Sequence, residues 1–88
     1  MHERALMTDL MRKIEEVARR DGAIRVTKIS VRLGALSHFT PDHFRDHFED
    51  ASRGTIAEGA EVDALLEDDV HAPDASGVVL ASIEVEAP

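Results

Sequence analysis

The chain has 88 residues, a formal net charge of −8 and no cysteine. This length predicts a single domain over residues 1–88, and the lack of cysteine excludes disulfides, thiolate metal sites and cysteine nucleophiles. The negative charge disfavours a nucleic-acid partner, because phosphate binding depends on Lys and Arg. No apolar run approaches the ~20 residues of a membrane helix and no signal peptide is visible, so we expect no membrane association and a cytoplasmic protein.

The first predicted element is an amphipathic helix over residues 3–21. Its apolar residues recur at spacings of four and three, which places them on one face. That face consists of Leu6, Leu10, Ile14 and Val17, widened by Met7, Met11 and Ala18. Gly22 follows as a natural C-terminal cap, since glycine readily adopts a left-handed conformation.

A strand is predicted over residues 24–33. Polar and apolar residues alternate from residue 28 to residue 33, as they do in a strand with one buried face. Ile24 and Val26 have the opposite parity, and this change predicts a β-bulge or a twist near Thr27-Lys28.

Thr40-Pro41 predicts the start of a second helix, with the Thr40 side chain as N-cap and Pro41 in the first helical position. The helix is expected to extend to about Ser52. Phe44 and Phe48 lie four residues apart, so both are expected on its buried side.

Two further strands are predicted over residues 61–66 and 79–86, joined by a loop over residues 68–77 that is rich in turn-forming residues. The order helix-strand-helix-strand-strand predicts an α+β fold of two layers, with two helices packed on one face of a three-stranded mixed sheet. The first two strands should be parallel and joined by a right-handed crossover. Lys28 and Arg32 would offset the acidic residues of the other strands, which favours the first strand in the middle.

Met1-His2-Glu3 is a candidate metal site. A free α-amine, the backbone amide nitrogens beyond it and the His2 imidazole can wrap one ion in fused chelate rings. All these donors are nitrogen, and a planar or tetragonal set of nitrogens is what Ni(II) and Cu(II) prefer. The alternative interpretation is an accidental histidine on a frayed chain end.

His43 and His47 are a second candidate, because two imidazoles four residues apart on a helix can chelate one ion. They flank Phe44 and Phe48, however, so histidines at the edge of the core or on the surface are the favoured interpretation. The role of His38, a few residues upstream, stays open. The sequence contains no nucleophile elbow and no Gly-rich phosphate loop, so no enzymatic activity is expected.

Several segments occur together in the order and with the spacing of a known family. They are Met1-His2-Glu3, residues 31–37 (VRLGALS), Thr40-Pro41-Asp42 leading to Phe48-Glu49, residues 54–61 (GTIAEGAE) and residues 82–86 (SIEVE). With these segments the whole chain resembles the HypA/HybF family of nickel metallochaperones, which help to assemble nickel-iron hydrogenases and sometimes urease.

The resemblance implies that Ni(II) binds at Met1, His2 and Glu3, through the terminal amine, the His2 imidazole and the amides of His2 and Glu3, with Glu3 also tuning the site. It implies a metallochaperone in the maturation of nickel-iron hydrogenase. The implied partners are a maturation GTPase or a hydrogenase precursor that receives the nickel. A homodimer is a further possibility, through the mixed charges on the outer face of the sheet.

The chain departs from this family in one respect. Family members carry a zinc domain with two Cys-x-x-Cys pairs between the second and third strands, whereas here the interval is the loop 68–77 and no cysteine remains. We therefore expect no zinc at those positions and an intact nickel-binding fold. The alternative function is an interaction or regulatory module that keeps the fold but does not deliver nickel.

Overall fold

A computed structural model describes the backbone of residues 2–88 and the side chains of residues 3–88. The elements in chain order are α1 (His2–Arg20), β1 (Arg25–Leu33), α2 (Pro41–Ser52), β2 (Glu61–Leu66) and β3 (Val78–Glu86). The predicted order is confirmed. None of the helices within residues 2–88 has the length and apolar character needed to span a bilayer. Met1 and the His2 side chain, which belong to the predicted nickel site, lie outside the described residues.

The sheet has the strand order β2-β1-β3, with β1 in the middle. β1 is parallel to β2 and antiparallel to β3, so the predicted mixed sheet is confirmed. Lys28 of β1 lies opposite Glu61 on one side and Glu84 on the other. The charge pattern thus identified the central strand, because a basic residue there faces acids on both neighbours.

The predicted β-bulge is present in β1. The register with β3 shifts between Val26 and Lys28, where the parity of the apolar residues changes in the sequence. A second shift, between Ser30 and Val31, was not predicted, because no change of parity marks it. Both shifts affect only the pairing with β3, and the pairing with β2 stays regular from Lys28 to Leu33.

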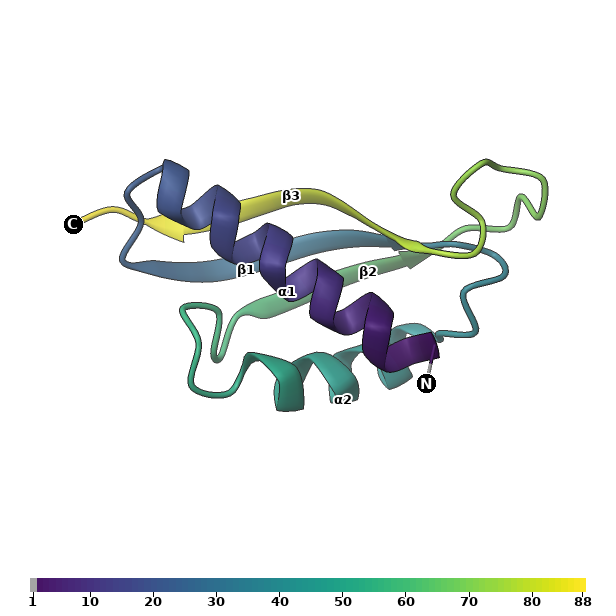
Figure 1. Ribbon diagram of the computed structural model, residues 1–88, viewed down its shortest axis with the longest axis horizontal. Helices are drawn as coiled ribbons and strands as arrows, with labels where there is room; N and C mark the ends of the chain where they lie inside the picture. Colours follow the sequence, from purple (N-terminus) through teal and green to yellow (C-terminus); the bar gives the residue numbers. More distant parts are fainter. Residues whose placement is uncertain (1) are drawn as a thin grey trace.

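α1 lies in front of the sheet and α2 runs beside β2 (Figure 1). Side chains of both helices and of β1 belong to one core, which confirms the two-layer α+β architecture. α1 crosses the sheet obliquely and packs against β3 and α2, while α2 packs against β2. The first turn of α1 therefore lies beside α2, although the two segments are far apart in the sequence.

Apolar side chains between the two layers form the core, and its largest fully buried members include Phe44, Phe48 and Ile14. Phe48 is only 2% exposed, as predicted. The buried face of α1 is centred differently from the prediction and consists of Met7, Leu10, Met11, Ile14 and Ala18. Leu6 and Val17 are only partly buried, because at 3.6 residues per turn they lie together at one edge of that face.

The connection between β2 and β3 is attached to the end of β1. The Glu67 amide donates to the Leu33 carbonyl at 2.8 Å, and the Gly34 amide donates to the Gly77 carbonyl at 2.9 Å. Ala75 of this connection is buried, and a Cβ atom on Gly34 would overlap its carbonyl oxygen. Only glycine fits at position 34 without a shift of the backbone.

Candidate metal centre

The predicted chelating motif coincides with the start of a helix. α1 begins at His2, and Glu3 lies in its first turn. The first amide groups of a helix have no acceptor within the helix, so helix formation does not occupy the amides of His2 and Glu3. Glu3 is the one predicted ligand whose side chain is described, and that side chain is 32% exposed.

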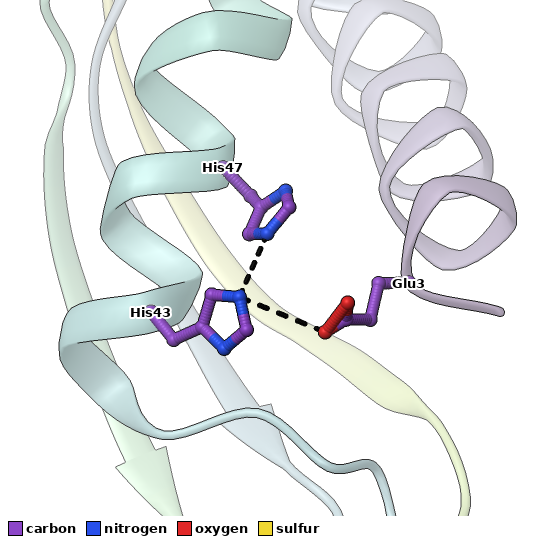
Figure 2. A group of neighbouring side chains, drawn as sticks. All are labelled: Glu3, His43 and His47. Atoms are coloured by element: carbon purple, nitrogen blue, oxygen red, sulfur yellow. Dashed lines mark hydrogen bonds and ion pairs between the residues drawn. The ribbon is translucent and has the colours of Figure 1, made fainter. Parts of the chain in front are cut away.

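The Glu3 carboxylate faces two histidines of α2, as Figure 2 shows. Nε2 of His43 lies 2.8 Å from Nε2 of His47 and 3.6 Å from Oε2 of Glu3. One ligand-type atom from each of the three residues can be chosen so that all lie within 4.8 Å of one another. The packing of α1 against α2 thus gathers two imidazoles and a carboxylate at one point.

The histidines are positioned by the start of α2. The Thr40 hydroxyl caps the helix and accepts a hydrogen bond from the His43 amide at 3.2 Å. Residues four apart project from the same side of a helix, so His43 and His47 extend toward α1 together. The local sequence therefore sets the spacing of the two rings, and the tertiary packing adds Glu3.

Phe39 supports both rings from the side of the core. Its ring centroid lies 5.7 Å from that of His43 and 5.9 Å from that of His47, in edge-to-face geometry. Phe39 is only 3% exposed and also packs edge-on against Phe44 at 5.5 Å. Its role was not predicted. The signal was present, however, because an apolar residue before the N-cap that meets the fourth helical residue is a hydrophobic staple.

The remaining histidines lie elsewhere. His38 is exposed, with a positive φ of 68°, and His71 is exposed in the connection between β2 and β3. Neither belongs to the group of ligand-type residues found among residues 3–88. His43 and His47 lie at the edge of the core, as the sequence favoured, but their approach to Glu3 was not predicted from the sequence.

The three side chains offer two kinds of ligand atom, imidazole nitrogen and carboxylate oxygen. Imidazole nitrogen binds zinc, copper, iron and nickel, and a carboxylate oxygen can complete such a set. In the structure the two rings form a hydrogen bond between their Nε2 atoms, so one ring donates and the other accepts. The chemistry available to this group is ligand exchange.

The fold is that of a small two-layer α+β protein. The sequence profile described as "Hydrogenase/urease nickel incorporation, metallochaperone, hypA" matches residues 1–71. The chain therefore belongs to the HypA family. The sequence predicted no enzymatic activity. Membership of this family agrees with that prediction, because the family is one of metallochaperones and not of enzymes.

Individual relatives agree with this assignment. The chain is 43% identical over 63 residues to the hydrogenase maturation factor HypA of Methylocella silvestris, covering 72% of this chain and 56% of the relative. It is 40% identical over 70 residues to HypA of Thermococcus kodakarensis, covering 80% and 50%. The chain thus spans about half the length of the curated relatives that it matches.

A solved structure shares the fold over its full length. The solution structure of the Ni metallochaperone HypA from Helicobacter pylori superposes with a TM-score of 0.78 and covers 100% of both chains. The sequence identity is 21%, so this comparison supports the fold alone.

Proposed function

We propose that this chain is a nickel carrier that binds Ni(II) at Met1, His2 and Glu3 and transfers it to a maturation GTPase or a hydrogenase precursor. The observation that carries the proposal is the position of His2 and Glu3 at the start of α1 in a chain of the HypA family. The proposal requires a free α-amine on Met1.

The proposed donors are the α-amine, the His2 imidazole and the amide nitrogens of His2 and Glu3. Consecutive donors close small chelate rings, and an all-nitrogen planar set suits Ni(II). The positive end of a helix dipole opposes a cation at this place. Amide nitrogens that lose their protons on coordination, together with the Glu3 carboxylate, supply negative charge that offsets this repulsion.

We further propose that residues 1–88 act as one nickel-binding domain. The loop 68–77 takes the place that the zinc domain occupies in the family, and no zinc is assigned to it because it contains no cysteine. The outer face of the sheet carries both signs of charge, including the ion pair between Lys28 and Glu61 at 3.6 Å. This face is the proposed surface for a homodimer.

A second function has one observation in its favour. The chain contains no cysteine, so it lacks the two Cys-x-x-Cys pairs of the zinc domain that the resemblance to the family implies. A protein of this kind could serve as an interaction or regulatory module of the maturation system without delivering nickel. Stoichiometric nickel binding by the native N-terminus separates the two functions.

The test is a calorimetric Ni(II) titration of protein with an untagged N-terminus. We expect one equivalent to bind at the N-terminus, and we expect His2→Ala and an acetylated amine each to abolish that binding, because each removes one donor. Circular dichroism should show the same fold in every variant, and His71→Gln is the matched control for a histidine outside the site. Unchanged nickel binding by both the His2→Ala variant and the acetylated protein would refute the carrier proposal.

A further inference from the structure

We propose that Glu3, His43 and His47 form a second metal site, made of side chains alone, for a divalent ion that imidazole favours, such as Zn²⁺ or Ni²⁺. This site goes beyond the proposed N-terminal chelate. It uses the carboxylate of Glu3, whereas the N-terminal chelate uses the backbone amide of Glu3.

The distances already approach those of a coordinated ion. Ligand atoms bound at about 2.0–2.1 Å to a tetrahedral ion lie about 3.3 Å apart. The two measured separations, 2.8 Å between the Nε2 atoms and 3.6 Å from His43 Nε2 to Glu3 Oε2, lie on either side of this value. One ligand atom from each residue can be chosen so that no pair exceeds 4.8 Å, and a small rotation of these partly exposed side chains completes the geometry.

Three features make this set more than a chance meeting of surface groups. The histidines belong to one helix and point the same way, so their Nε2 atoms converge without any backbone movement (Figure 2). Phe39 packs edge-on against both rings and limits their rotation. The side chains of His43 and Glu3 are 45% and 32% exposed, which leaves a path for the ion and room for a water ligand.

Binding involves a defined rearrangement of one proton. In the hydrogen-bonded pair one imidazole carries its proton on Nε2 and donates it to the other ring. The ion requires the lone pairs of both Nε2 atoms, so the donating ring must carry its proton on Nδ1 instead. The ion then takes the place of the shared proton.

The experiment isolates the side-chain site from the N-terminal chelate. The background protein carries several residues added before Met1 together with His2→Ala, so neither the original amine nor the His2 ring can bind. Zn²⁺ and Ni²⁺ are titrated separately into this protein by calorimetry. We expect one equivalent of either ion to bind, and ¹⁵N-labelled imidazole spectra to show shifts at His43 and His47 but not at His71.

Substitutions in the same background identify the ligands. We expect His43→Gln, His47→Gln and Glu3→Gln each to weaken binding by at least about 10-fold, because loss of a ligand should cost no less than loss of an outer-sphere partner. His71→Gln should leave binding unchanged. Glutamine supports a helix, and circular dichroism verifies that each variant is folded.

Two outcomes would overturn the proposal: no stoichiometric binding by the background protein, or binding that survives in the protein with both His43→Gln and His47→Gln. Either failure is distinct from failure of the carrier proposal, which is decided by His2→Ala in protein with a native N-terminus and intact His43 and His47.

Discussion

Because Gly34 has no side chain, the connection between β2 and β3 can pack against the end of β1. Gly22 has a φ of 64° and is needed for its backbone conformation, whereas Gly34 is needed because the Ala75 carbonyl oxygen lies where a Cβ would be. Interiors are packed too densely to absorb such an overlap without movement. Gly34 therefore links the end of β1 to the connection between β2 and β3.

We expect Gly34→Ala to lower the free energy of unfolding by about 1–3 kcal/mol, the usual cost of forcing an extra carbon into a packed site. Urea denaturation measures the change. Gly77→Ala is the matched control, since Gly77 accepts the hydrogen bond from Gly34 and its own Cβ would be 3.8 Å from its nearest neighbour, the Asp74 carbonyl oxygen. Equal stability of the two variants would contradict this account.

The residues of the candidate centre were only partly predictable. The spacing of His43 and His47 could be predicted from the sequence, because both residues lie on one helix. Their approach to Glu3 depends on how α1 crosses α2, which no local pattern specifies. The contact of Phe39 with the rings was partly predictable. The hydrophobic staple follows from the local sequence, but the position of the two rings over Phe39 does not.

Among the elements, α2 was predicted from Pro41 to Ser52 and is found over the same residues. Its start is defined by strong local signals, an N-cap threonine followed by proline. α1 was predicted over residues 3–21 and is found over His2–Arg20. The centre of its buried face was not predicted correctly. Spacings of four and three identify the apolar side of a helix, while the neighbouring layer decides which residues of that side are covered.

Thr40→Ala should destabilise α2 and with it the pair of histidines. Loss of an N-cap side chain costs about 0.5–2 kcal/mol, because the His43 amide loses its acceptor. Thr40→Ser is the control, since serine keeps the hydroxyl. Chemical denaturation compares the two variants, and histidine NMR signals report on the rings. If Thr40→Ala proved as stable as Thr40→Ser, the capping hydrogen bond would not contribute to stability.

At the scale of the whole molecule, the charge pattern predicted the order of the strands in the sheet, and the hydrophobic periodicity predicted the two layers. The central position of β1 was predictable because Lys28 faces acids on both neighbouring strands, Glu61 on β2 and Glu84 on β3, whereas Arg32 lies opposite the apolar Leu65 and Val79. The packing of the connection between β2 and β3 was not, because it depends on a close approach to Gly34 that sequence patterns do not specify.

A core of this size depends strongly on each large side chain. Phe48→Ala should reduce the free energy of unfolding by about 3–5 kcal/mol, a large part of the stability of a small domain. Phe48 is 2% exposed and stacks on Phe44 with centroids 6.2 Å apart. Thermal and urea denaturation measure the loss. Leu65→Ala is the control, because Leu65 is 60% exposed, and a similar loss there would show that the core lies elsewhere.

The two hydrogen bonds that attach the connection between β2 and β3 to the end of β1 have a consequence for the evolution of the chain. Glu67 and Gly77 are each held to the same short stretch, Leu33-Gly34, so the two ends of the connection stay close together whatever lies between them. The entropy of closing a loop changes only slowly with its length. Segments of very different size can therefore be gained or lost at this point while the sheet keeps its register, which makes the connection a natural insertion point for an additional module.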